Sequence, residues 1–329
     1  MSEHLEVQSV LPTPDPVNAI YSRTLEQVEK VVYGQTGAAR LCLAALFSNG
    51  HVLVEGVPGI AKTTLVRTIA ATLSMEFSRV QFTPDLLPND ITGSYVYRAN
   101  TGEFEFRPGP IFANFVLADE INRASPKTQS ALLEAMQEGT VTQERQVFPL
   151  PSPFVVFATQ NPVEHEGTYP LPLAQLDRFM FKVVLGYPDG ESECRILSEH
   201  HTITDGKAFE ALHTEKVADQ KAVLDAKELI RNTFVRPEVI RYVQALVTST
   251  RDDPNLMVGA SPRAGLALLM GAKSLSRFDG RDFVTPEDVK EAFLPALRHR
   301  VVLNAAAELE GMTPEEALSQ TLNRIEVPR

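Results

Sequence analysis

Cysteine is scarce in this sequence: among 329 residues, only Cys42 and Cys194 are cysteines. The two lie far apart, and their spacing is not that of a metal site or a redox pair. We expect both thiols to be reduced, buried and inert, as is usual in a cytoplasmic protein.

An excess of basic charge and long apolar runs are also lacking. The chain has 31 Lys and Arg residues against 42 Asp and Glu residues, a net charge of −11. This balance disfavours a nucleic-acid duplex as the main partner, although a ring of subunits could still enclose a basic channel. No apolar run approaches the roughly 20 residues of a membrane span. The first 17 residues also lack the layout of a signal peptide, so we expect a cytoplasmic protein.

The most informative segment follows a short apolar strand, His51–Glu55, and precedes a helical pattern from Thr64 to Leu73. A strand, a glycine loop, Lys-Thr and a helix form the order of a phosphate-binding loop, in which backbone N–H groups and the helix dipole face an anion. Lys62 would neutralise the β- and γ-phosphates of a nucleotide, and the Thr63 hydroxyl would bind Mg²⁺. The predicted ATP-binding residues here are Gly56, Val57, Pro58, Gly59, Ile60, Ala61, Lys62, Thr63 and Thr64.

Ala61 departs from the general pattern G-x-x-x-x-G-K-[ST], because it stands in the place of the second glycine. We expect its methyl group to be excluded if the backbone φ at this position is positive. An ordinary strand-to-helix turn in an α/β core is the alternative interpretation of the loop.

The first half of the chain alternates short apolar strands with helical patterns, which predicts a parallel sheet covered on both faces. Two stretches of period-two alternation interrupt this order and indicate hairpins, one at Thr92–Tyr97 with Glu103–Arg107 and one at Thr140–Val147. We expect strands at His51–Glu55, Phe77–Phe82, Asn114–Ala118, Phe154–Thr159 and Phe181–Leu185.

The composition changes near residues 186–190, beyond which we find helical patterns and no convincing strand. We therefore expect a flexible tail at residues 1–18, an α/β core with two hairpin insertions at 19–188, and a smaller all-helical domain at 189–329. The expected helices of that domain are Ser192–His200, Ala222–Arg231, Pro237–Thr250, Pro262–Phe278, Pro286–Arg300 and Pro314–Gln320.

Three polar residues end two of the predicted strands. Asp119 and Glu120 follow one strand, and Asn161 follows the next, so all three would lie at the carboxyl edge of the sheet, where α/β proteins bind ligands. Asp119 would hold Mg²⁺ through water, Glu120 would deprotonate the attacking water, and Asn161 would sense the γ-phosphate. The alternatives are a solvated acidic turn and an Asn-Pro turn.

Two arginines are candidates for stabilising transition-state charge. Arg178 lies late in the core, so it would reach a neighbour's nucleotide, unless it forms a salt bridge with Asp177 or another nearby acid. Arg263 lies in the first turn of a helix of the second domain, where its own helix dipole does not favour it. We expect Arg263 to contact a γ-phosphate and so tie the two domains together, with a plain surface arginine as the alternative.

Together, the segments GVPGIAKT, VLADEINRA, ATQNPVEHEGTYPLPLAQLDRF and GASPRA resemble the MoxR family of AAA+ ATPases over residues 31–327. The resemblance implies that Lys62 and Thr63 belong to Walker A, Asp119 and Glu120 to Walker B, and Asn161 to sensor 1. It further implies that Arg178 is an arginine finger that acts across a subunit boundary and that Arg263 is sensor 2.

The resemblance has further implications. Gly34 and Gln35 match a segment that lies against adenine, Arg123 is a second candidate for an interface arginine, and Ala61 is common in the family's phosphate loop. At Leu173 the family more often has glutamate, which affects a local interface contact. The two hairpins match family insertions that commonly face a ring's pore or its partner.

The function implied is Mg²⁺-dependent hydrolysis of ATP by a ring, most simply a hexamer, with Arg178 completing the neighbour's site. The output would be chaperone-like remodelling or maturation of a client protein, including metal insertion into enzymes, together with a von Willebrand factor A domain partner. Two alternatives remain open. One is an ATP-driven nucleic-acid motor, which the net charge disfavours, and the other is an ATP-gated scaffold with little turnover, which the intact Asp119-Glu120 pair disfavours.

Overall fold

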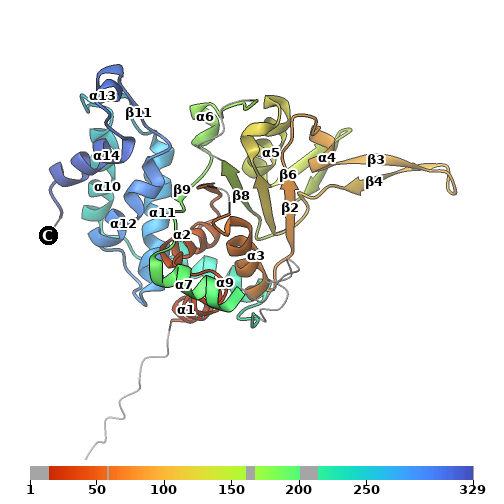
Figure 1. Cartoon of the computed structure of the whole chain (residues 1–329), viewed down its shortest axis with the longest axis horizontal. Coiled ribbons are helices and arrows are strands. Elements are labelled where there is room, and N and C mark those ends of the chain that lie inside the picture. Colours follow the sequence, from red (N-terminus) through yellow and green to blue (C-terminus); the bar gives the residue numbers. More distant parts are fainter. Residues whose placement is uncertain (1–14, 58, 161–166, 201–213, 329) are drawn as a thin grey trace, which may run out of the picture.

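A five-stranded parallel sheet forms the centre of the N-terminal half of the protein (Figure 1). The computed structural model describes residues 15–57, 59–160, 167–200 and 214–328. The strand order is β2-β5-β8-β1-β9, and every pairing in this sheet is parallel. The strands agree with the predicted ones to within one residue at each end: β1 Val52–Glu55, β2 Phe77–Gln81, β5 Phe115–Asp119, β8 Val155–Gln160 and β9 Phe181–Val184.

The three central strands β1, β5 and β8 are buried on both faces of the sheet, and neighbouring residues on each strand point to opposite faces. On one face, Phe115 and Phe157 stack with ring centroids 5.7 Å apart in the core that also contains helices α1, α2 and α3. On the other face, Val116 and Val156 pack against α5. The helices around the sheet are α1 Pro16–Glu29, α2 Thr36–Phe47, α3 Lys62–Thr72 and α5 Pro126–Glu138.

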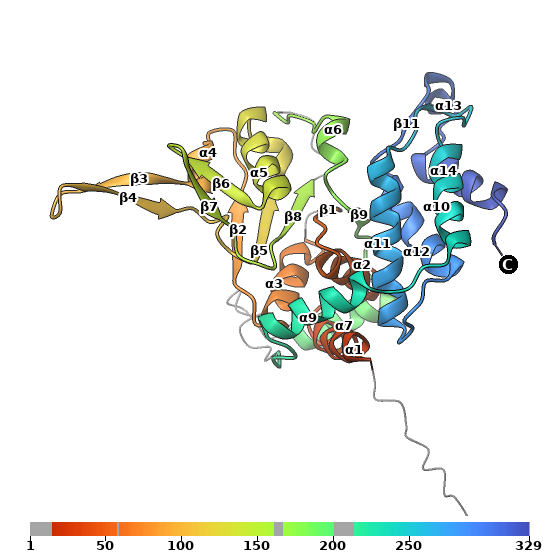
Figure 2. The same cartoon turned by 180° about the vertical axis from the view of Figure 1, so that it is seen from behind.

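Two antiparallel hairpins are inserted into this α/β core, as predicted. Strands β3 (Gly93–Arg98) and β4 (Glu103–Pro108) follow the short helix α4 (Pro88–Thr92) and project away from the body of the protein (Figures 1 and 2). Strands β6 (Thr140–Gln143) and β7 (Gln146–Pro149) form the second hairpin. Phe106 stacks on Phe148 with ring centroids 4.0 Å apart, so the two hairpins support each other.

The C-terminal region is mainly helical, but it also contains a small antiparallel ladder that the sequence did not predict. Strand β10 (Leu256–Val258) pairs with β11 (Val302–Leu303). Such short strands leave too few residues for a recognisable period of two. Helix α12 ends at Leu297, three residues before its predicted end, and β11 follows it. The helices are α7 Gly190–His200, α9 Gln220–Arg231, α10 Pro237–Ser249, α11 Pro262–Phe278, α12 Pro286–Leu297, α13 Ala305–Leu309 and α14 Pro314–Arg324.

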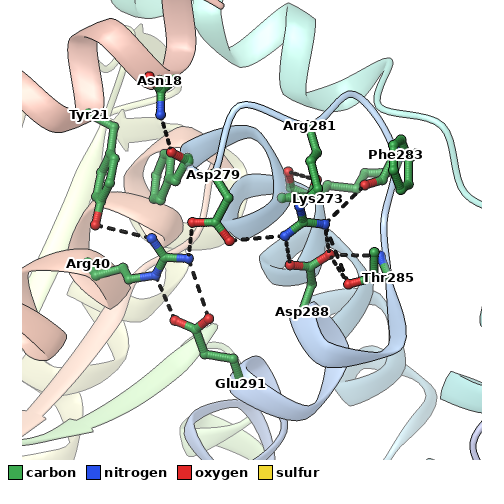
Figure 3. Close-up of polar contacts among 12 residues, drawn as sticks. Asn18, Tyr21, Arg40, Lys273, Asp279, Arg281, Phe283, Thr285, Asp288 and Glu291 are labelled. Carbon is green, nitrogen blue, oxygen red and sulfur yellow. Dashed lines mark hydrogen bonds and ion pairs between the residues drawn. The ribbon is translucent and has the colours of Figure 1, made fainter.

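A network of charged side chains joins helix α2 to the C-terminal helices (Figure 3). Arg40 donates hydrogen bonds to Asp279 at 2.8 Å and to Glu291 at 2.7 Å, and its Nη1 lies 3.1 Å from the Tyr21 hydroxyl. Arg281 forms a second fork onto Asp288, at 2.6 and 2.7 Å. Planar guanidinium groups bind carboxylates with defined geometry, so the Arg40 pairs orient α2 against the C-terminal region, and the Arg281 fork orders Asp288 within that region.

One of the two predictions for the cysteines is wrong. Cys42 is buried in α2, and burial raises the pKa of its thiol to about 12. Cys194 is exposed on α7, where none of the described side chains is fully buried. Separately, no helix in the described part of the chain is both long and apolar enough to cross a bilayer.

Candidate functional site

The loop between β1 and α3 has the backbone of an anion cradle. Gly59 has φ +84°, and Ala61 caps α3 in the left-handed conformation with φ 63° and ψ 26°. The expectation that a methyl group is excluded at positive φ is therefore wrong, since the protein accommodates this strain. Gly56 is required for packing, because a Cβ there would lie 2.4 Å from Ile60 Cδ1 and 2.9 Å from the Leu185 carbonyl oxygen. Pro58 lies outside the described residues.

Lys62 opens α3 and folds back over the loop. Its Nζ donates a 2.7 Å hydrogen bond to the Gly56 carbonyl. Burial lowers the pKa of Lys62, and the nearby carboxylates of Asp119, Glu120 and Glu55 oppose this shift. The ammonium thus lies between the phosphate loop and the acids that end β5. Thr63 and Thr64 follow in the first turn of α3, at the positive end of the helix dipole.

Gly34 and Gln35 lie against the segment that follows β9. The Gln35 amide donates a 2.9 Å hydrogen bond to the Gly186 carbonyl. A Cβ on Gly34 would approach Ser192 Oγ to 3.1 Å, and the residue has φ +70°. The Leu185 amide donates to the Glu55 carbonyl at 2.8 Å, which brings this segment beside the phosphate loop.

Asp119 ends strand β5 and is held from two neighbouring strands. The buried Thr159 hydroxyl of β8 donates to Asp119 Oδ1 at 2.6 Å and accepts from the Glu120 amide at 2.8 Å. Arg79 of β2 donates to Asp119 Oδ2 at 2.5 and 3.2 Å. The carboxylate of Asp119 is therefore oriented by side chains from both strands that flank β5.

Glu120 adopts a left-handed backbone, with φ 56° and ψ 49°, and begins the 3₁₀ helix η1 at Ile121–Arg123. Gln81 donates to Glu120 Oε2 at 2.8 Å, and Arg123 Nε lies 3.1 Å from the same oxygen. Arg123, expected as a second interface arginine, thus contacts the candidate base of its own chain. Asn161, the predicted γ-phosphate sensor, lies outside the described residues.

The two predicted arginines line one cavity of about 300 Å³, together with His51, Met136 and Met180. Arg178 donates a 2.6 Å hydrogen bond to the Leu133 carbonyl of α5. His51 precedes β1, whereas the phosphate loop follows it, so the cavity lies at the amino edge of the sheet. A four-residue strand separates the two edges by about 13 Å. Arg263 therefore lies at the amino edge of the sheet, away from the phosphate loop of its own chain.

The sequence did not predict three residues that contact Asp119 or Glu120, namely Arg79, Gln81 and Thr159. Arg79 and Gln81 are polar residues on β2, and Thr159 is the fifth residue of β8. Their common feature is a place near the carboxyl end of a strand that neighbours β5. That feature depends on the strand order, which a single sequence does not reveal.

A parallel sheet, a phosphate loop at the end of β1 and paired acids at the end of β5 define the class of P-loop nucleoside triphosphatases. Family models agree: residues 51–181 match the ATPase family associated with various cellular activities (AAA), and residues 248–321 match the AAA lid domain.

Similar proteins extend this result to the whole chain. The chain is 44% identical over 316 residues to the chaperone MoxR1 of Mycobacterium tuberculosis, covering 93% of this chain and 82% of that protein. It is 43% identical over 314 residues to the uncharacterized protein YeaC of Bacillus subtilis, covering 95% and 97%. A crystal structure from Cytophaga hutchinsonii, of a protein proposed to be an ATPase, aligns with a TM-score of 0.87 at 40% identity, covering 95% and 96%. The chain belongs to the MoxR family of AAA+ ATPases, and its enzymatic activity is ATP hydrolysis.

Proposed function

We propose that the protein hydrolyses ATP at the boundary between two copies of itself in a ring and uses the energy to remodel a client protein. The position of Arg178 and Arg263 carries this proposal. Both line a cavity at the amino edge of the sheet, whereas Lys62, Asp119 and Glu120 lie at the carboxyl edge. A second copy would have to supply the arginines to each ATP.

The phosphate loop suits ATP as the bound nucleotide. The positive φ of Gly59 and Ala61 and the N-terminus of α3 beside them suit a bound anion. Lys62 would move from the Gly56 carbonyl to the β- and γ-phosphates. Gly34 and Gln35, held against Gly186, would flank the adenine.

The oxygen donors at the site fit Mg²⁺, which prefers hydroxyl, carboxylate and water ligands. Thr63 and Asp119 would hold it, the latter through water, and Arg79 would then give up part of its contact with Asp119. When bound, the ion neutralises charge that develops on the phosphates.

Glu120 is the proposed base for the attacking water. Its carboxylate is oriented by Gln81 and Arg123, and its backbone is tied to Thr159, so the oxygen that would accept the proton is positioned before ATP binds. Asn161 would contact the γ-phosphate from the end of β8. Arg178 and Arg263 of the neighbouring copy would stabilise the transition-state charge.

The biological output proposed is chaperone-like remodelling or maturation of a protein client. The similarity to a protein named chaperone MoxR1 supports it. The projecting hairpin β3–β4 offers exposed Tyr97 and Phe104 at a distance from the ATP site. We further propose a hexameric ring and a partner with a von Willebrand factor A domain, on the basis of the family.

Two substitutions test the proposal. Glu120→Gln should abolish ATP turnover and leave nucleotide binding within about twofold, because the amide cannot accept the proton. Arg178→Ala should lower turnover by about a thousandfold or more. Mixing Arg178→Ala with Lys62→Ala subunits should then restore roughly a quarter of the wild-type turnover, since half of the subunits bind ATP and half of those adjoin an intact arginine.

Arg241→Ala, at an exposed arginine of α10 that pairs with Glu238 on the same helix, serves as the matched control. Normal turnover in Arg178→Ala, or no recovery in well-mixed rings, would contradict action across the boundary. Strong stimulation of turnover by DNA, but not by a protein partner, would favour a nucleic-acid motor instead.

A further inference from the structure

Arg300, in the C-terminal region, reaches into the core and holds the segment that carries Arg178. Its Nε donates to Asp177 Oδ1 at 2.7 Å. Its two terminal nitrogens donate to the carbonyl oxygens of Asp177, Phe179 and Met180 at 3.0, 2.7 and 3.0 Å. Arg300 is 3% exposed, so these bonds form almost without competition from water.

Two more residues of the C-terminal region contact the same segment. The Ser261 hydroxyl donates to both carboxylate oxygens of Asp177, at 3.1 and 3.0 Å. The buried His299 Nε2 lies 2.9 Å from the Phe179 carbonyl oxygen and donates to it. Ser261 caps α11, two residues before Arg263. Asp177 therefore links Arg178, the next residue of the chain, to the helix end that carries Arg263.

The backbone of residues 177–180 divides its hydrogen bonds between the two regions. The N–H groups donate within the core, to the carbonyl oxygens of Leu173, Gln175, Leu176 and His51. The carbonyl oxygens of Asp177, Phe179 and Met180 accept from Arg300. The place of Arg178 therefore depends on the C-terminal region as much as on the core.

A planar fork is needed for this arrangement. The five N–H groups of a guanidinium reach several acceptors in one plane, whereas a lysine ammonium at the same place is a single point donor. The carboxylate of Asp177 compensates the buried charge, and burial lowers the pKa of Arg300.

We propose that Arg300 is a positioning residue that makes the helical C-terminal region set where Arg178 is presented to the neighbouring copy's ATP. The inference rests on the function proposed above. A shift of the C-terminal region moves Asp177 through Arg300 and Ser261, and Arg178 moves with it. The position of the C-terminal region in one copy thereby controls ATP hydrolysis in the neighbouring copy.

The test uses full-length Arg300→Lys, which keeps the charge and loses the fork. Alone, it should lower turnover by between about tenfold and a hundredfold, as a misplaced catalytic group does. The Kd for a fluorescent ATP analogue should stay within about twofold, since the variant's own phosphate loop is intact. Mixed with Lys62→Ala subunits, whose Arg178 is correctly held, it should recover turnover as the Arg178→Ala mixture does.

Arg324→Lys is the matched control, because Arg324 pairs with Asp253 elsewhere in the C-terminal region. If Arg300→Lys does not fold, turnover, Kd and recovery with Lys62→Ala subunits are measured on Asp177→Asn and Ser261→Ala instead. Turnover within about twofold of wild type in Arg300→Lys overturns the inference. No recovery with Lys62→Ala, while the Arg178→Ala mixture recovers, also overturns it and leaves the proposed function standing. Normal turnover in Arg178→Ala overturns both.

Discussion

The buried Thr159 hydroxyl donates a 2.6 Å hydrogen bond to the carboxylate of Asp119 and also accepts one from the amide of Glu120. One side chain of β8 therefore orients both acids of β5. Each of its two bonds satisfies a polar group that has little access to water.

Thr159→Val keeps the shape of this side chain and removes both hydrogen bonds. We expect ATP turnover to fall by about tenfold to a hundredfold, the usual effect of losing a partner that orients a ligand or a base. Steady-state turnover and nucleotide Kd measure it. Thr159→Ser, which retains the hydroxyl, should stay within about threefold of wild type. Equal losses in both variants would contradict a role for the hydroxyl.

Ala61 offers a test of backbone strain. A non-glycine residue in the left-handed region costs about 1–2 kcal/mol, so Ala61→Gly should raise the free energy of unfolding by up to about 1 kcal/mol after the entropy of glycine is subtracted. Ala61→Val, with a branched Cβ, should lower it by about 1–3 kcal/mol. Urea denaturation measures both. Greater stability of the valine variant would exclude positive φ in solution.

His51 makes the free energy of unfolding depend on pH in the acid range. Its Nε2 donates to the Met136 carbonyl and its Nδ1 accepts from the Val156 amide, and burial lowers its pKa from 6.5 to about 4. The unfolded chain therefore binds a proton that the folded chain does not, and stability is lost as the pH falls from about 6.5 to 4. This shift corresponds to about 3 kcal/mol.

His51→Gln isolates this contribution, because the variant keeps all other titrating groups, the buried His299 included. The difference in unfolding free energy between wild type and variant should narrow by about 3 kcal/mol between pH 6.5 and pH 4. Urea denaturation at several pH values measures it. A constant difference over this range would show that His51 titrates normally.

Lys227 is a buried cation of α9, and burial lowers its pKa from 10.5 to about 8. At pH 7 the folded protein keeps this charge at a cost, so Lys227→Met should raise the free energy of unfolding by about 1–3 kcal/mol. The gain should shrink as the pH rises from about 8 to 10.5, where the folded protein already releases the proton. Lys221→Met, at an exposed position of the same helix, should change stability by less than about 0.5 kcal/mol. A net loss of stability on Lys227→Met would contradict this.

Local sequence signals predicted the sheet strands and several helices well. Helices α5 and α11 have the predicted bounds, because Pro126 and Pro262 each follow a serine at the N-cap position and begin an apolar pattern. The phosphate loop could also be predicted from the sequence, because its residues are contiguous. Ala61 shows the limit of a local rule: steric preference alone argued against positive φ, and the loop imposes it.

Long-range relations could not be read from one sequence. The bond from Gln81 to Glu120 needs β2 and β5 to be neighbours, and that from Thr159 to Asp119 needs β5 next to β8. The position of Arg263 at the amino edge depends on how α11 packs on the core. Strands β10 and β11 lie more than 40 residues apart, and neither is long enough to show a pattern by itself.

Strand β9 forms one edge of the sheet, and the C-terminal helices cover it: α12 lies against it, and a Cβ on Gly271 of α11 would come within 2.5 Å of the Phe181 ring. An ATPase core cut after residue 188 would therefore expose an unpaired strand edge together with buried aromatic surface. Uncovered edges of this kind pair with other chains and aggregate. The helical region therefore covers this edge of the core, and we expect the core without it to aggregate.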